Sequence, residues 1–273
     1  YVSVAVMDTG IFRHMDFDTR IAGFADFVGR KKYLYDDNGH GTHVAGIIAG
    51  SGKGSNGKYR GIAPDTFLVS VKVLDKSGNG KIENVVEAAG WIIENKSAMN
   101  IRVVNISFGT RAKMENGPAI ETGEDDYALI MAVEKMWDSG IVVVAAAGNN
   151  GPGNASVTAP GISKKIITVG AFDDKNFFSG RGPTRECIVK PEVVVTGSNI
   201  IACNNHQGRY SSKSGTSMAA PVVSGAVARL IKNNPDITPK EVKIWMKSCC
   251  KKINVPSEKQ GWGVLDIRKF VTG

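Results

Sequence analysis

The chain has 273 residues, of which 42% are hydrophobic and 22% are charged, with 34 Lys and Arg against 26 Asp and Glu. This balance excludes a disordered chain, and no apolar run reaches the roughly 18 residues that a membrane-spanning helix needs. The net charge of +8 comes from scattered residues without a basic helix face or interleaved aromatic side chains, which argues against a nucleic-acid partner.

Short apolar runs rich in β-branched residues alternate with longer helical patterns along the chain. This alternation predicts an α/β fold, with a parallel sheet that helices cover on both faces. The expected strands, in chain order, are Val2–Val6, Phe67–Val73, Ile101–Ile106, Ile141–Ala146, Ile166–Val169 and Val193–Val195. The expected helices are Gly41–Gly50, Ile82–Asn95, Asp126–Ser139, Ser217–Asn233 and a last one that begins after Thr238 with a capping box.

Three glycine-flanked segments place an acid, a base and a nucleophile at the ends of these elements. Asp8 follows the first strand in Asp-Thr-Gly, and His40 begins the first helix in His-Gly-Thr-His. Ser217 precedes an apolar helix in Gly-Thr-Ser-Met-Ala-Ala-Pro, and we expect Pro221 in its first turn, where a missing N–H is harmless. An acid that orients an imidazole, which takes the proton of a serine, is the arrangement of nucleophilic acyl transfer.

The order of these residues along the chain separates the folds that use this chemistry. All four histidines precede Ser217, which excludes the Ser–acid–His order of the α/β-hydrolases, whereas the order Asp, His, Ser is that of subtilisin. One alternative is a metalloprotein that uses Asp8, His40 and His43, but it leaves the serine segment unexplained. Another is a catalytically inactive binding module, which would normally have lost one of the catalytic residues.

Further segments extend the match, and the chain resembles the catalytic domain of a bacterial subtilisin-like serine endopeptidase over nearly its whole length. These segments are 61–64 (Gly-Ile-Ala-Pro), 104–109 (Val-Asn-Ile-Ser-Phe-Gly) and 143–151, which contains Gly-Asn-Asn-Gly. The resemblance implies one domain over residues 1–273, with a three-layer subtilisin-like fold around a mostly parallel central sheet. It implies catalytic roles for Asp8, His40 and Ser217, and an oxyanion donor in Asn149.

The resemblance also implies how a peptide substrate binds and which partners the chain has. The substrate would add as a strand between two segments of the chain. The implied substrate-binding residues are Gly78, Asn79, Gly80, Ser107, Phe108, Gly109, Ala147, Gly148 and Thr158. We expect protein or peptide substrates, an N-terminal propeptide that is not in this chain, a monomer, and a cis peptide bond at Ala159–Pro160. Secretion is slightly favoured over a cytoplasmic location.

Cofactors and cysteines complete the sequence-based expectations. No cofactor is required; relatives often bind calcium near residues 51–60, but that loop lacks acidic ligands here, so we assign no metal-binding residue. We expect Cys187, Cys203, Cys249 and Cys250 to be free thiols: the adjacent pair 249–250 cannot bridge without strain, and the spacing neither predicts nor excludes a disulfide between Cys187 and Cys203. The carboxylates of residues 110–127 predict a modest preference for substrates with basic residues before the cleaved bond.

Overall fold

The computed structural model describes residues 1–110, 119–121, 126–175 and 178–273. Within these ranges a sheet of nine strands runs through the molecule in the order β13–β14–β10–β9–β8–β5–β1–β3–β2. Neighbouring strands are parallel except β13 and β14, which are antiparallel. The strands are β1 (Ser3–Asp8), β2 (Ile21–Asp26), β3 (Phe67–Lys72), β5 (Ile101–Ile106), β8 (Val142–Ala146), β9 (Ile167–Ala171), β10 (Val193–Val195), β13 (Cys250–Lys251) and β14 (Val264–Leu265).

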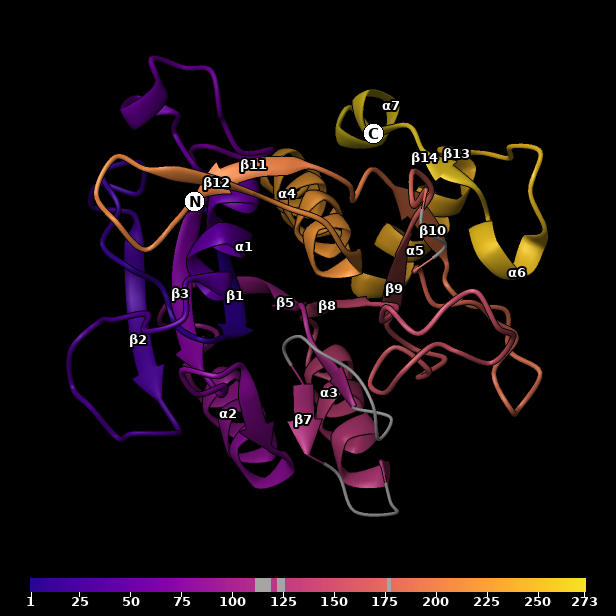
Figure 1. Ribbon diagram of the computed structural model, residues 1–273, viewed down its shortest axis with the longest axis horizontal. Coiled ribbons are helices and arrows are strands. Elements are labelled where there is room, and N and C mark those ends of the chain that lie inside the picture. Colours follow the sequence, from indigo (N-terminus) through magenta and orange to yellow (C-terminus); the bar gives the residue numbers. More distant parts are fainter. Residues whose placement is uncertain (111–118, 122–125, 176–177) are drawn as a thin grey trace.

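Helices cover the sheet on both faces and make the three layers that the sequence predicts (Figure 1). On one face lie α1 (His40–Ala49), α4 (Thr216–Asn233) and α5 (Pro239–Ser248); on the other lie α2 (Ile82–Asn95) and α3 (Tyr127–Asp138). Two short helices, α6 (Ser257–Gln260) and α7 (Ile267–Val271), end the chain. The capping box at Thr238 is present at the start of α5, as expected.

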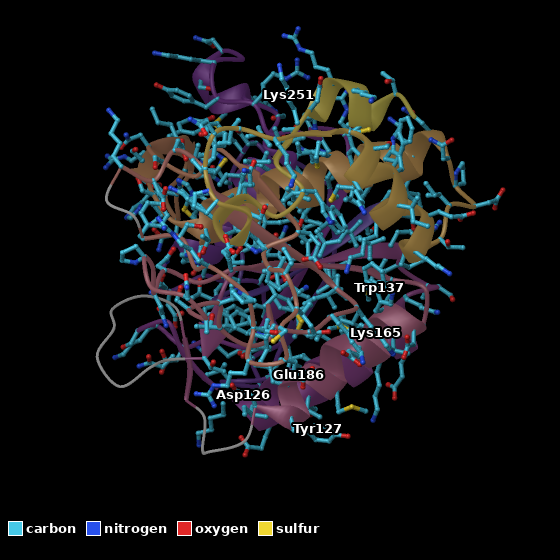
Figure 2. The ribbon with its side chains drawn as sticks, turned by 90° about the vertical axis from the view of Figure 1, so that its right-hand side faces the viewer. Asp126, Tyr127, Trp137, Lys165, Glu186 and Lys251 are labelled. Atoms are coloured by element: carbon cyan, nitrogen blue, oxygen red, sulfur yellow. The ribbon has the colours of Figure 1, made fainter. Side chains whose placement is uncertain are left out.

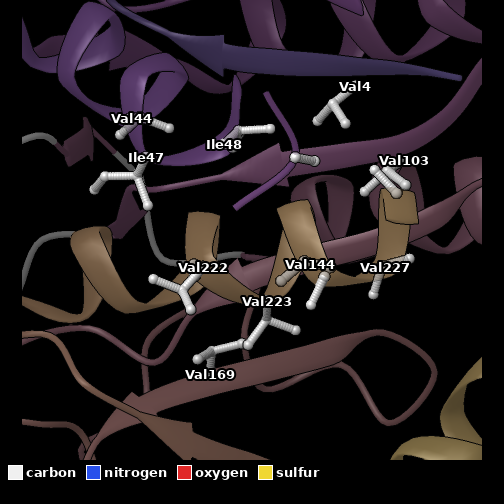
Figure 3. Close-up of a cluster of buried hydrophobic side chains, with 14 of the residues drawn as sticks. Val4, Val44, Ile47, Ile48, Val103, Val144, Val169, Val222, Val223 and Val227 are labelled. Atoms are coloured by element: carbon white, nitrogen blue, oxygen red, sulfur yellow. The ribbon is translucent and has the colours of Figure 1, made fainter. Parts of the chain in front are cut away.

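The hydrophobic core has two halves, one on each face of the sheet. Along β1, Val4 and Val6 belong to the half under α1 and α4, whereas Ala5 and Met7 belong to the half under α2 and α3. Alternate side chains of a strand point to opposite faces, so a strand that is buried on both sides must be apolar throughout. Figure 3 shows the first half, where valines of the strands meet Val222, Val223 and Val227 of α4.

In the part of the chain that the structure describes, two smaller sheets lie outside the central one. A hairpin of β11 (Ile200–Cys203) and β12 (Tyr210–Lys213) contacts α1. A three-stranded sheet has the order β4–β7–β6, with bounds Asn79–Lys81, Ala119–Glu121 and Gly109–Thr110, and both of its pairs are parallel. A single 3-10 turn, η1 (Lys53–Ser55), lies in the loop after α1.

Several further expectations can be compared with the structure. The Ala159–Pro160 peptide bond is cis and the four cysteines are free, as expected. No helix in the described part of the chain is both long and apolar enough to cross a membrane.

Most of the acidic segment 110–127 lies outside the described residues, but Asp126 is the N-cap residue of α3 (Figure 2). At the other end of α3, Lys165 pairs with Asp138 at 2.7 Å.

Candidate active site

The candidate catalytic residues lie where elements of the central layers begin or end. Asp8 is the last residue of β1, which is flanked by β3 and β5 in the middle of the sheet. His40 is the first residue of α1, and Ser217 is in the first turn of α4. Helix α4 contacts both α1 and β1. The carboxyl edge of a parallel sheet is where such folds place ligands, so the local order of the chain brings these side chains to one region.

Asp8 and His40 form a buried pair. The Nδ1 atom of His40 lies 2.8 Å from Oδ1 of Asp8, and the same oxygen accepts a hydrogen bond from the backbone N–H of Thr9 at 2.7 Å. Asp8 is fully buried and His40 is 7% exposed. With the Nδ1 proton facing the carboxylate, Nε2 is the basic nitrogen of the ring. A Cβ atom at position 41 would lie 2.1 Å from the Gly10 carbonyl oxygen, so the close approach of α1 to β1 requires Gly41.

A residue that the sequence analysis did not select, Asp36, holds the start of α1. Its carboxylate accepts hydrogen bonds from the backbone N–H groups of Gly39 at 2.8 Å and Thr42 at 2.9 Å, and from the Thr9 hydroxyl at 2.9 Å. A carboxylate at a helix N-terminus satisfies free N–H groups and interacts favourably with the helix dipole. Asp36 therefore fixes His40 from one side and the turn after Asp8 from the other. In the sequence, the signal that could have indicated this role of Asp36 is an acidic residue shortly before the start of a helix.

Ser217 and Ser107 are joined by two hydrogen bonds in opposite directions. The Ser217 hydroxyl donates to the Ser107 carbonyl oxygen at 2.8 Å, and the Ser107 hydroxyl donates to the Ser217 carbonyl oxygen at 2.9 Å. Because a hydroxyl has one proton, the serine in this rotamer is directed at Ser107 and must rotate about its Cα–Cβ bond to donate to His40.

The expected position of Pro221 in the first turn of the helix is wrong. Pro221 lies inside α4, in the second turn, because it is the sixth residue of a helix that begins at Thr216. Proline has no N–H, so the carbonyl four residues earlier, that of Ser217, loses its helical donor. The Ser107 hydroxyl supplies that donor instead.

Asn149 follows β8, and Thr216 holds its side-chain amide. The Asn149 Oδ1 atom accepts from the backbone N–H of Thr216 at 3.0 Å and from the Thr216 hydroxyl at 3.1 Å. That hydroxyl in turn accepts from the backbone N–H of Gly148 at 3.1 Å. Because these donors occupy the amide oxygen, the Nδ2 group of Asn149 remains available as a donor. Asn149 is exposed and lies beside the first turn of α4. The backbone N–H of Ser217 is also in that first turn, where helices leave N–H groups without helical acceptors.

The two segments expected to flank the substrate form strands of the same small sheet. Residues 79–81 form β4 and residues 109–110 form β6, but β7 of the chain itself lies between them. In the register, Ala119 of β7 is opposite both Asn79 and Gly109. Gly78 precedes β4 with φ of +80°. Phe108 is 2% exposed and belongs to the core, so only its main chain can face a substrate.

The other expected substrate-binding residues pack against each other. The backbone N–H of Thr158 donates to the Ala147 carbonyl at 3.1 Å. A Cβ atom would lie 2.6 Å from the Thr158 Oγ1 atom if built on Gly148, and 2.1 Å if built on Gly109. The absence of a side chain at these two glycines therefore makes room for Thr158.

His43 does not join His40 and Asp8. Its Nε2 group donates to the carbonyl oxygens of Ile200 at 3.1 Å and Ser211 at 2.9 Å, which ties α1 to the β11–β12 hairpin. Burial lowers the pKa of His43 to about 4, so its ring is neutral in the folded protein near neutral pH. The alternative metal site of Asp8, His40 and His43 is not formed among the described residues.

A different cluster, His14, Asp16 and Cys203, has the ligand types that metals use. The Asp16 carboxylate, however, accepts hydrogen bonds from the backbone N–H groups of Gly52 at 3.0 Å and Gly54 at 2.9 Å, and from the Tyr210 hydroxyl at 2.9 Å. Burial raises the pKa of the Cys203 thiol, which opposes formation of the thiolate that a metal needs. The loop after α1 thus satisfies Asp16 with N–H donors, and we assign no metal to it.

A buried Asp–His pair lies at the carboxyl edge of the mostly parallel sheet, and a serine lies in the first turn of a helix beside an oriented asparagine amide. These features define the class of Asp–His–Ser serine hydrolases. Comparison with known proteins places the chain within that class: it belongs to the subtilase family, whose model matches residues 1–263.

Individual relatives agree with this assignment. The chain is 42% identical over 274 residues to the serine protease AprX of Bacillus subtilis (strain 168), covering 90% of this chain and 60% of AprX. It is 35% identical to subtilisin DY of Bacillus licheniformis, covering 89% of this chain and 81% of that protein. Among solved structures, a cold adapted subtilisin-like serine proteinase superimposes with a TM-score of 0.77 at 30% identity, covering 97% of this chain and 86% of the other. The chain therefore spans less than two thirds of the length of AprX.

Proposed function

We propose that this chain is a serine endopeptidase that hydrolyses peptide bonds in proteins or peptides through an acyl-enzyme intermediate. The observation that carries the proposal is the buried Asp8–His40 hydrogen bond next to a helix whose first turn contains Ser217. Membership of the subtilase family and similarity to named serine proteases support it.

In the proposed reaction, the Ser217 hydroxyl turns from the Ser107 carbonyl toward Nε2 of His40, which takes its proton as Oγ attacks the substrate carbonyl. Asp8 keeps the Nδ1 proton in place and stabilises the imidazolium. The Asn149 amide and the Ser217 backbone N–H donate to the oxyanion. Collapse of the tetrahedral intermediate breaks the C–N bond, and His40 gives its proton to the leaving amine. Water then repeats the same steps on the acyl-enzyme and frees Ser217.

We propose that the substrate main chain pairs with the segments around β4 and β6. Strand addition supplies affinity through main-chain hydrogen bonds, and pockets for alternate side chains supply selectivity. Because β7 pairs with both strands, a substrate bound there must displace β7 or use the part of residues 107–109 that β7 leaves open.

The extent of the domain and the partners are also proposals. A single domain over residues 1–273 is supported by the central sheet, which contains both β1 and β14. The family resemblance supports protein substrates, an N-terminal propeptide as a folding partner and a monomeric state, and the scattered basic residues argue against a nucleic-acid partner.

The test is covalent labelling by a fluorophosphonate probe, together with hydrolysis of a casein or peptide substrate. We expect Ser217→Ala to abolish labelling and nearly all hydrolysis, whereas Ser212→Ala, an exposed serine on β12, leaves both unchanged. Absence of labelling in the unmodified, folded protein would favour the alternative, an inactive binding module.

A further inference from the structure

A series of hydrogen bonds, which we call the relay, leads from the middle of α4 through the end of β5 to Ser217. The Ser224 hydroxyl donates to Oδ1 of Asn105 at 2.8 Å, and Nδ2 of Asn105 donates to the Ser107 hydroxyl at 2.9 Å. The Ser107 hydroxyl donates to the Ser217 carbonyl at 2.9 Å. Asn105, Ser107 and Ser224 are all fully buried. We propose that Asn105 and Ser224 are positioning residues that act through Ser107 to fix the nucleophile; this inference rests on the proposed function of Ser217.

The donors and acceptors of these side chains fix the direction in which each hydrogen bond of the relay is donated. The amide of Asn105 has one accepting end and one donating end, and Ser224 occupies the accepting end. The donating end therefore faces Ser107, whose hydroxyl receives that hydrogen bond and has its own proton left for the Ser217 carbonyl. If the amide turned over, Ser107 would donate to Asn105 instead, and the Ser217 carbonyl would lose its partner.

Pro221 makes this last hydrogen bond necessary. It removes the N–H that would otherwise satisfy the Ser217 carbonyl within α4, so the helix alone cannot hold the backbone of its catalytic turn. A helix carbonyl that has lost its donor is unfavourable, and the turn would shift to find another one. Ser107 prevents this shift, so the backbone of the catalytic turn is held against the residue that follows β5.

Loss of the relay should slow the chemical step more than it weakens substrate binding. Attack on a carbonyl depends on the position of Oγ, and displacements of about 1 Å can change rates by about 10²-fold. Asn105 and Ser224 are buried and lie behind Ser217, so neither side chain can touch a substrate. Loss of the relay should therefore lower kcat and the rate of covalent labelling while leaving KM nearly unchanged.

The primary test is Ser224→Ala, which removes one hydroxyl at the far end of the relay. We expect kcat and the second-order rate of fluorophosphonate labelling to fall about threefold to tenfold, with KM within about twofold, as for the loss of one hydrogen bond. The matched control is Ser3→Ala. Ser3 is equally buried and its hydroxyl donates one hydrogen bond, to the Met99 carbonyl, but it begins β1 at the edge away from Asp8. The control should leave both rates unchanged.

A second variant tests the direction of the relay. Asn105→Asp keeps the shape of the side chain but replaces the donating end with an oxygen, so Ser107 must donate to it and abandon the Ser217 carbonyl. We expect a kcat loss larger than that of Ser224→Ala, and little further loss when both changes are combined, because the residues act in series. Ser224→Thr, which keeps the hydroxyl, should recover most of the labelling rate.

The inference and the proposed function fail in different ways. If the unmodified protein reacts with the probe but Ser224→Ala and Asn105→Asp react as fast as Ser3→Ala, the relay does not position the nucleophile. A loss confined to KM would equally overturn it. If the unmodified folded protein does not react at all, the proposed function itself is wrong.

Discussion

The Asn149 side chain receives two hydrogen bonds from one residue, Thr216, at 3.0 Å from its backbone N–H and 3.1 Å from its hydroxyl. Thr216 is the residue directly before Ser217, so the turn of α4 that contains the candidate nucleophile also holds the candidate oxyanion donor. The amide is thus oriented before any substrate arrives, and a preorganised donor is worth more to a transition state than one that must be ordered during the reaction.

We therefore expect Asn149→Ala to lower kcat by about 10²–10³ with little change in KM, a range that comes from the equivalent change in subtilisin itself. Thr216→Val, which removes the hydroxyl but keeps the backbone N–H, should give a smaller loss of kcat. Thr216→Ser keeps both donors and serves as the control. Steady-state kinetics on one peptide substrate measures all three variants. A large KM increase at constant kcat would show that Asn149 binds the ground state instead.

The Asp8–His40 pair gives a second prediction. Asp8→Asn would present an amide N–H to Nδ1 of His40 and favour the tautomer with its proton on the wrong nitrogen. The corresponding change in a serine protease of different fold lowers kcat about 10⁴-fold, and we expect a loss of this order here. The rate of fluorophosphonate labelling is the measurement. Asp18→Asn, an exposed carboxylate that pairs with Lys53, is the control and should react normally. Normal labelling of Asp8→Asn would remove Asp8 from the mechanism.

The pairing of β7 with β4 and β6 gives a third prediction, for substrate binding. Ile120 is the middle residue of β7 and is opposite Gly80 on one side and Thr110 on the other. Proline at this position has no N–H and is poorly tolerated inside a sheet. If a substrate strand competes with β7, Ile120→Pro should lower KM for long peptides and leave KM for a short ester substrate unchanged. An equal effect on both substrates, or a higher KM for peptides, would contradict this competition.

The sequence predicted the central sheet well because strands buried on both faces are apolar throughout. Strands β2, β13 and β14 were missed. Strand β2 lies at the edge of the sheet and most of its side chains are partly exposed, which breaks the continuous apolar pattern, and β13 and β14 have only two residues each. The position of Pro221 was wrong because a proline in the second turn needs another donor for the carbonyl four residues earlier. Ser107, which is distant in the sequence, supplies that donor to Ser217.

The residues of the candidate site also fall into two groups, those that the sequence could indicate and those that only the structure could identify. Asp8, His40, Ser217 and Asn149 lie in local motifs beside strands and helices, and sequence reasoning could select them. Asn105 and Ser224 are 119 positions apart and have meaning only through their contact in the folded chain. No local pattern distinguishes Ser224 from any other small residue of an apolar helix, so only the three-dimensional structure could identify the relay.

The final prediction concerns stability and His43. Its pKa is about 4 in the folded protein because burial disfavours the charged ring, whereas an unperturbed histidine has a pKa of about 6.5. Between these values the unfolded chain binds a proton that the folded chain does not, so protons favour unfolding there. The contribution of His43 is fully present above about pH 6.5 and is lost progressively as the pH falls toward 4. A separation of this size corresponds to a loss of about 3 kcal/mol of unfolding free energy.

Urea unfolding at pH 7 and pH 4.5 measures this effect, with Ser217→Ala as the background so that the protein does not digest itself. His43→Gln provides the comparison, because its amide can still donate toward the carbonyls of Ile200 and Ser211 but does not titrate. We expect the difference in unfolding free energy between the two pH values to be smaller in His43→Gln by about 2 kcal/mol. Burial also lowers the pKa of His14, so part of the acid sensitivity should remain in the variant. If the pH dependence is the same with and without His43, the neutral buried ring is not what makes the fold sensitive to acid.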